Sequence, residues 1–126
     1  MVESFLNKLK EFMGIGYYYC TTGNAKYWYK NHKLHREDGP AIERISGDKE
    51  WYKNGRLHRE DGPAVEYANG DKSWDKNGKL HREDGPAMEY ANGKKEWWIG
   101  GVYISELKNI FAWPSAPPWV QIINFQ

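Results

Sequence analysis

The chain has 126 residues, with 18 Lys and Arg against 17 Asp and Glu and a formal net charge of +1. A balance so close to zero argues against a protein that binds nucleic acid through a surplus of cationic side chains, and a single cysteine allows neither an internal disulfide nor a cysteine-based zinc site. Because 16% of the residues are aromatic, the chain does not have the composition of a disordered protein, and its length predicts one small folded domain.

The apolar runs are shorter than the roughly 20 residues that a membrane-spanning helix needs. The first residues, Met1 to Ser4, lack the basic and then apolar pattern of a secretory signal peptide. A lone cysteine is typical of a reducing compartment. These features predict a cytoplasmic protein without a membrane partner.

The N-terminal segment, residues 1–16, carries the pattern of an amphipathic helix. Between Val2 and Met13 apolar side chains recur every three or four positions, which places them on one helical face. Gly14 and Gly16 then end the helix. Its polar face is not basic, which disfavours docking on a membrane. We therefore expect this helix to cap the first hairpin of the region that follows.

Residues 17–104 form a repetitive region. Tryptophan recurs at a constant interval of 23 residues, at positions 28, 51, 74 and 97. This interval defines three complete copies, 28–50, 51–73 and 74–96, with a partial copy on either side. The octapeptide Leu-His-Arg-Glu-Asp-Gly-Pro-Ala is identical in all three. Such repeats stack on one another, and atypical end copies close the faces that stacking leaves open.

Turn dipeptides divide each copy into pieces of strand length. Asn-Gly stands at 54–55, 69–70, 77–78 and 92–93. This dipeptide is typical of the type I′ turn, in which both central residues have positive φ. Runs such as 63–68 and 71–76 lie between the turns, and they predict one β-hairpin for each copy. The Leu-His-Arg-Glu segment that follows is either a short third strand or an extended loop.

The predicted fold class is therefore mainly β: an array of 23-residue β-hairpin repeats that form a twisted antiparallel sheet, capped by a short helix at each end. The tryptophan row is the predicted core, since burying one Trp removes roughly 150–250 Å² from water, which contributes on the order of 4–6 kcal/mol. The apolar residues expected beside this indole spine are Ile42, Val65, Met88, Leu34, Leu57 and Leu80.

Residues 105–126 contain a second predicted helix and a tail. Ser105 is suited to the N-cap of a short helix that runs towards Phe111. Three prolines between Trp113 and Trp119 fix φ and remove backbone donors, so this tail is expected to be extended chain. It either packs over the array or stays exposed as a binding segment.

The copies resemble a known type of repeat. The stretch 51–64, Trp-Tyr-Lys-Asn-Gly-Arg-Leu-His-Arg-Glu-Asp-Gly-Pro-Ala, resembles the MORN-variant hairpin repeats, and more specifically the repeats with this octapeptide in tailed bacteriophages and large DNA viruses. The similarity covers residues 28–104, and the ending at 100–107 is similar to the helix that closes such viral repeat proteins. The resemblance implies a β-hairpin array of phage or prophage origin that binds or scaffolds proteins. Lipid binding is not carried over, because His32 stands in place of a turn glycine.

The three His-Arg-Glu-Asp segments are the only cluster in the sequence that is suited to chemistry. General acid–base catalysis needs two titratable groups whose surroundings push their pKa values apart, and near-identical copies do not provide that asymmetry. A metal site would need His35, His58 and His81 to converge, whereas a translational repeat keeps them roughly 10 Å apart. We predict no catalytic residue, no metal and no cofactor, and we expect the arginines of the octapeptides to pair with carboxylates of the same or adjacent copies.

These features together predict a non-enzymatic, protein-binding repeat module. The resemblance implies a phage-type accessory protein that acts in the host cytoplasm and binds and inhibits a host protein, such as a CRISPR or other defence effector. Two alternatives stay open. Lysines beside Trp51 favour base stacking on nucleic acid, although the acidic residues of every copy oppose it, and the array could instead be a structural or scaffolding component of a virion.

Tyr, Trp and Arg contribute most of the binding energy at protein interfaces. On that basis the predicted partner-binding residues are Tyr29, Tyr52, Arg36, Arg59, Arg82, Trp113 and Trp119. The oligomeric state is open, because exposed edge strands invite pairing unless the terminal helices cover them.

Overall fold

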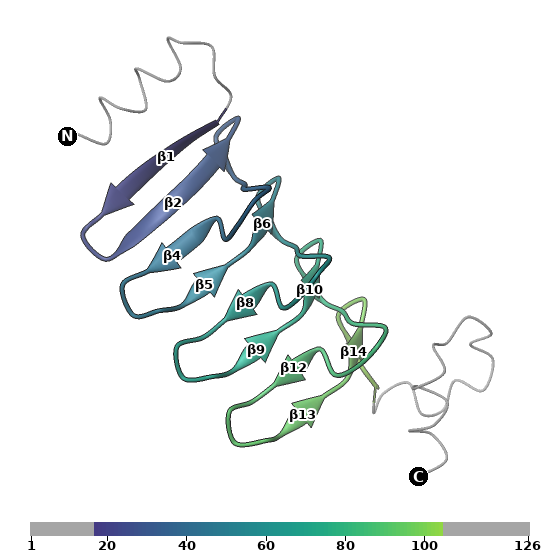
Figure 1. Ribbon diagram of the computed structural model, residues 1–126. Helices are drawn as coiled ribbons and strands as arrows, with labels where there is room; N and C mark the ends of the chain where they lie inside the picture. The colour runs from purple at the N-terminus through teal and green to yellow at the C-terminus, as the bar shows by residue number, and fades with distance from the viewer. Residues whose placement is uncertain (1–16, 105–126) are drawn as a thin grey trace.

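The structure, a computed structural model, describes residues 17–104 as a stack of short antiparallel hairpins (Figure 1). The mainly β, antiparallel architecture predicted from the repeats is confirmed in this range. Both predicted capping helices, in 1–16 and 105–126, and the tail with Trp113 and Trp119 lie outside the described residues. No helix within 17–104 is long and apolar enough to cross a membrane.

The largest element is a nine-stranded sheet that runs the length of the array. It begins with the two longest strands, β1 (Tyr17–Thr22) and β2 (Ala25–Lys30), which pair over six residues. Each complete copy then adds one hairpin, so that the strand order is β1-β2-β4-β5-β8-β9-β12-β13. These hairpins are β4 (Ile42–Arg44) with β5 (Lys49–Glu50), β8 (Val65–Glu66) with β9 (Lys72–Ser73), and β12 (Met88–Glu89) with β13 (Lys95–Glu96).

A second row of smaller hairpins lies along one side of this sheet, where Figure 1 labels β6, β10 and β14. Its members are β6 (Tyr52–Lys53) with β7 (Arg56–Leu57), β10 (Asp75–Lys76) with β11 (Lys79–Leu80), and β14 (Trp98–Ile99) with β15 (Val102–Tyr103). In the first copy β3 (Lys33–Leu34) pairs with the end of β2 in the same way.

Each copy therefore contains two hairpins, and the prediction of one was wrong. From Trp51 onwards the regularly spaced tryptophans mark the point where the chain leaves the large sheet and enters the second row: Trp51, for example, separates β5 from β6. The leucine of each octapeptide ends a strand of the second row, and the His-Arg-Glu that follows is loop. This result settles the choice between strand and loop that the sequence left open.

The two rows use different turns. In the second row Asn54 and Gly55 have φ of 51° and 80°, so the predicted type I′ turn is confirmed there. Asn77 and Gly78 repeat it, with φ of 53° and 79°. His32 takes the glycine position in the first copy with φ of 64°, a left-handed conformation that is uncommon outside glycine but that histidine adopts more often than most residues.

The turns of the large sheet differ from the prediction. At 69–70 and 92–93 only the glycine has positive φ, 98° at Gly70 and 91° at Gly93. The Gly70 amide donates to the carbonyl of Tyr67 at 3.0 Å, and the Tyr67 amide donates to the carbonyl of Asp71 at 2.9 Å. This is a three-residue loop in which a type I turn is followed by a left-handed glycine. Asn-Gly suits it as well as a type I′ turn, so the dipeptide alone did not distinguish the two.

Neighbouring copies are hydrogen-bonded to one another in both rows. In the second row the amides of Gly55, Gly78 and Gly101 donate to the leucine carbonyl of the preceding copy at 2.8, 2.8 and 2.9 Å. In the large sheet the Asp48 carboxylate accepts from the Ala68 amide, and Asp71 from Ala91, each at 2.7 Å. Lys94 occupies this aspartate position in the last complete copy. The stack is thus held by backbone bonds in both rows, which in the large sheet include the strand pairs β5–β8 and β9–β12, and by aspartate at the turns of the large sheet.

The interior is filled by small side chains. The alanines that end the three octapeptides, Ala41, Ala64 and Ala87, are 0% exposed, and Ile42 and Val65 beside them are 4% exposed. The tryptophans at 28, 51, 74 and 97 are only half-buried, as are Met88 and the leucines at 34, 57 and 80. The predicted core of stacked indoles was therefore wrong. From Trp51 onwards each of these tryptophans stands between a strand of the large sheet and a strand of the second row, and its ring is only partly enclosed there.

An alanine with no exposed area leaves no room for a larger side chain. We expect Ala64→Leu to lower the free energy of unfolding by about 1–3 kcal/mol, the usual cost of overpacking. Ala68→Leu is the matched control in the same copy, because Ala68 is exposed, and it should change stability by less than about 0.5 kcal/mol. Urea denaturation followed by tryptophan fluorescence measures both, and equal effects would contradict this description of the interior.

Candidate functional site

The octapeptide loops are organised around their arginines. The Arg36 guanidinium lies over the Trp28 ring, with 3.9 Å between Cζ and the ring centroid. The same stack recurs at 3.9 Å for Arg59 over Trp51 and at 4.0 Å for Arg82 over Trp74. A cation above an indole face is attracted by the ring quadrupole. The periodic tryptophan therefore receives the arginine of its own copy.

The rest of the loop holds the guanidinium in place. In the second copy Arg59 Nε donates to Asp61 at 3.0 Å, and Nη1 donates to the Pro63 carbonyl at 3.0 Å and to Glu66 at 3.3 Å. A Cβ at Gly62 would lie 3.0 Å from Arg59 Cζ. Equivalent contacts occur in the other two copies. The predicted pairing of these arginines with carboxylates is confirmed, and each pair lies within one copy.

The histidines join each copy to the next. His35 Nδ1 accepts the Asn54 amide at 3.0 Å, and His35 Nε2 lies 2.8 Å from Glu37 Oε1. A nitrogen that accepts carries no proton, so in the neutral ring Nε2 holds the proton and donates it to the carboxylate. His58 makes the same two contacts, with the Asn77 amide and with Glu60. His81 makes them with the Gly100 amide and with Glu83.

These hydrogen bonds lower the pKa of Glu37 and of Glu60, each through its own histidine. Each ring therefore uses Nδ1 for a contact with the next copy and Nε2 for a contact within its own copy. Within residues 17–104, no group of three His, Cys, Asp or Glu side chains is arranged to hold a metal ion.

The octapeptide loops expose their carboxylates to solvent and largely bury their arginine side chains. The arginine side chains are about one-fifth exposed, 22% at Arg36, whereas Glu37 and Asp38 are 61% and 87% exposed. The glutamates and aspartates at 60–61 and 83–84 are exposed to a similar degree. The edge formed by the three loops, which we call the acidic edge (residues 37–38, 60–61 and 83–84), therefore carries negative charge at regular intervals.

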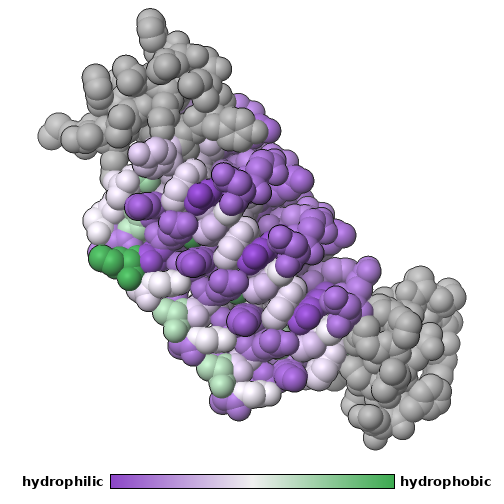
Figure 2. Space-filling model, viewed as in Figure 1, coloured by the Kyte–Doolittle hydropathy of each residue, from purple (hydrophilic) through white to green (hydrophobic). Residues whose placement is uncertain are grey.

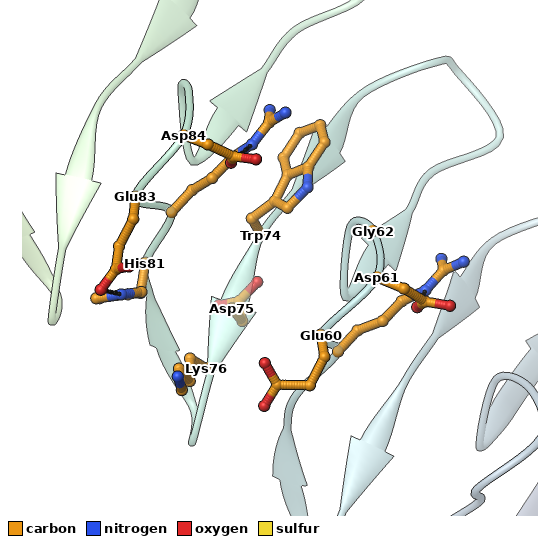
Figure 3. A pocket seen from close by; sticks show the side chains of 11 residues that line it. Glu60, Asp61, Gly62, Trp74, Asp75, Lys76, His81, Glu83 and Asp84 are labelled. Atoms are coloured by element: carbon orange, nitrogen blue, oxygen red, sulfur yellow. Dashed lines mark hydrogen bonds and ion pairs between the residues drawn. The ribbon is translucent and has the colours of Figure 1, made fainter. Parts of the chain in front are cut away.

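Grooves lie between successive loops of this edge. The first, of about 680 Å³, lies between the loops of the first and second copies, and the second, of about 650 Å³, lies between those of the second and third. The residues of the second groove are those of the first shifted by one copy, and Figure 3 shows them. One lining position differs in chemistry: Tyr52 in the first groove is replaced by Asp75 in the second.

This variable position changes together with the residue two places before it. The Tyr52 hydroxyl donates to Glu50 at 3.1 Å, and the Trp98 indole donates to Glu96 at 3.1 Å. At positions 73 and 75 the order of donor and carboxylate along the chain is reversed: the Ser73 hydroxyl donates to the Asp75 carboxylate at 2.7 Å. Each pair keeps one donor and one carboxylate, and only in the pair with Asp75 does the carboxylate belong to a residue that lines a groove.

Burial raises the pKa of both groups that differ. It raises the pKa of Tyr52 to about 12, with the Glu50 carboxylate as the next cause. Burial likewise raises the pKa of Asp75, against the opposing effect of the Ser73 hydrogen bond. The two grooves therefore have a phenol and a buried carboxyl group at the same place.

The structure brings some of the predicted partner-binding residues together. Tyr52, Arg36 and Arg59 line the first groove, and Arg59 and Arg82 line the second. Tyr29 lies on β2, outside both grooves, with its ring centroid 6.5 Å from that of Tyr27. That these residues bind a partner stays a prediction.

The carboxylates of the acidic edge and Asp75 were not among the predicted partner-binding residues. The signal for Asp75 was present, because residues 73 and 75 depart together from the equivalent residues 50 and 52. No family model, no curated protein and no solved structure matches this chain.

The glycine of the octapeptide should be required only because of the arginine beside it. We expect Gly62→Ala to lower the free energy of unfolding by about 1–2 kcal/mol, because the new Cβ would displace the Arg59 guanidinium from Trp51. In an Arg59→Ala background the same change should be neutral, which a double-mutant cycle measures. Gly23→Ala is the control, since no atom lies within 4 Å of its Cβ position. Equal costs in both backgrounds would disprove the contact.

The raised pKa of Tyr52 predicts a loss of stability at high pH. Below pH 10 both folded and unfolded states keep the phenol proton; above it the unfolded phenol ionises first, at about 10, while the folded one ionises at about 12. The stability present below pH 10 is therefore lost as the pH rises through 12. The difference in phenolate absorbance between wild type and Tyr52→Phe should titrate near 12, and a difference that titrates near 10 would contradict the burial.

Proposed function

We propose that this protein is a non-enzymatic binding module whose repeat array docks onto another protein. The observation that carries the proposal is the division of labour in the octapeptide. Its arginine and histidine hold the array together, and its exposed carboxylates and the two grooves between loops form a surface that repeats every 23 residues.

The contacts of the titratable groups support binding over catalysis. In the described copies each octapeptide histidine is engaged by the amide of the next copy and a glutamate of its own. A catalytic pair needs a nucleophile or base within reach of a substrate atom. Here the same groups are fixed by contacts that the fold itself uses.

The surface chemistry favours a protein partner over nucleic acid. The acidic edge carries six exposed carboxylates at positions 37, 38, 60, 61, 83 and 84. A phosphate backbone would be repelled by this edge. Figure 2 shows that the visible face of the array is covered mainly by hydrophilic side chains. A partner recognised here would be bound through charge and hydrogen bonds around a few aromatic side chains.

The biological role that we propose is that of a phage-type accessory protein that binds and inhibits a host protein in the host cytoplasm, such as a CRISPR or other defence effector. The resemblance of the octapeptide repeats to those of bacteriophages supports this role. Inhibition would follow from occupation of the partner's surface by a rigid array. A virion component with the same repeats would instead be recovered in purified particles.

Affinity capture tests this function. The full chain, immobilised and exposed to a bacterial lysate, should enrich one host protein, which mass spectrometry identifies. Tyr52→Ala should weaken binding of the purified partner by at least about tenfold, because interface aromatics contribute most of the binding energy. Tyr67→Ala is the matched control: Tyr67 is 44% exposed, lies at the turn of the large sheet and lines neither groove.

The purified partner's own activity, measured with and without the array, then tests inhibition. Recovery of no protein above background would contradict the proposal. The proposal would also be contradicted if the Tyr52→Ala and Tyr67→Ala variants both bound the captured partner with the affinity of the wild type.

A further inference from the structure

We propose that the second groove, between the loops of the second and third copies, is a binding site for a cationic side chain, the guanidinium or ammonium group of a basic segment in a protein partner, with Asp75 as its counter-ion. The inference rests on the proposed function in one respect, that the cation belongs to a protein.

The buried carboxylate of Asp75 is the starting point. Asp75 is 7% exposed, and its one hydrogen-bond donor among the described residues is the Ser73 hydroxyl, on Oδ1. No ion pair joins it to a lysine or arginine of residues 17–104. Buried carboxylates are normally paired with a cation or held by several donors. Asp75 therefore lacks the counter-charge that its burial calls for.

The groove gives access to this carboxylate. Its volume of about 650 Å³ is sufficient for a long side chain and the backbone that carries it. Figure 3 shows Asp75 on the strand between the loops that carry Glu60 and Glu83. A guanidinium that enters between these loops passes two exposed carboxylates before it reaches Asp75.

The charge of the lining favours a cation. Five carboxylates line the groove, those of Glu60, Asp61, Asp75, Glu83 and Asp84. Arg59 and Arg82 also line it, but each is held by hydrogen bonds to its own loop. The remaining cation, Lys76, is exposed. The groove thus keeps an excess of negative charge after its internal pairs are formed.

Comparison with the first groove makes the site specific. There the equivalent residue is Tyr52, and its carboxylate partner Glu50 lies outside the groove lining, where Tyr52 and Arg44 both donate to it. A bare metal ion fits the second groove less well than a guanidinium, since no group of three suitable ligands occurs in residues 17–104. Planar donors of arginine can instead bind one carboxylate in two places.

The direct test is an NMR titration of the full chain with N-acetyl-arginine amide, with N-acetyl-citrulline amide as the neutral probe of the same shape. We expect amide shifts centred on residues 74–76 with the arginine probe and none with citrulline. Asp75→Asn, which keeps an acceptor for Ser73, should weaken binding by at least about tenfold.

Two variants exchange the grooves. Ser73→Glu/Asp75→Tyr places the Glu-Tyr pair of positions 50 and 52 at positions 73 and 75, and should abolish the shifts. Arg44→Tyr/Glu50→Ser/Tyr52→Asp places the Ser-Asp pair at positions 50 and 52, and should create a new site around Trp51. Arg44 is changed as well, to the residue found at the equivalent position 67, because it binds Glu50 and would otherwise pair with the new aspartate.

The inference is overturned if the arginine probe causes no saturable shifts near residue 75, if citrulline binds equally, or if Asp75→Asn binds as wild type does. These outcomes are separable from the fate of the proposed function. A host partner that binds wild type and Ser73→Glu/Asp75→Tyr equally would leave the function standing and reject the site. Arginine binding that depends on Asp75, without any captured partner, would support the site and reject the function.

Discussion

The stack of a guanidinium on an indole, repeated once in each copy, is the interaction on which this structure depends. It explains why tryptophan, arginine, glycine and proline recur together: the arginine covers the ring, the glycine leaves space for it, and the proline carbonyl accepts from it. Cation and ring are both half-buried, where such a pair is stronger than in open water. The arginine contacts that close the loop thus lie within one copy.

The histidine of the same octapeptide serves the contact between copies. Its Nδ1 accepts an amide from the next turn, and together with the leucine carbonyl it joins one small hairpin to the following one. Aspartates at 48 and 71 do the same for the large sheet. Because each copy meets only its neighbours, a side chain that faces a groove can change while the frame is kept. The pairs Glu50 with Tyr52 and Ser73 with Asp75 are such changes.

In an array built in this way, the residues that stabilise the fold differ from those that are exposed at the grooves. The buried alanines and stacked arginines specify the spacing, and the exposed carboxylates together with the residue at 52 or 75 specify what the grooves present. A ligand that spans two grooves would meet different chemistry in each. We propose that this asymmetry within a periodic frame serves the recognition of one partner.

The sequence by itself determined the period, the mainly β class, the type I′ turn at Asn54 and the pairing of arginine with nearby carboxylates, because all of these depend on residues close together in the chain. Only the tertiary structure decided that each copy folds into two hairpins, that alanines such as Ala64 fill the interior in place of the tryptophans, and that Asp75 is buried without a cation. Those features depend on strand pairing and packing between copies, which a pattern within one copy does not contain.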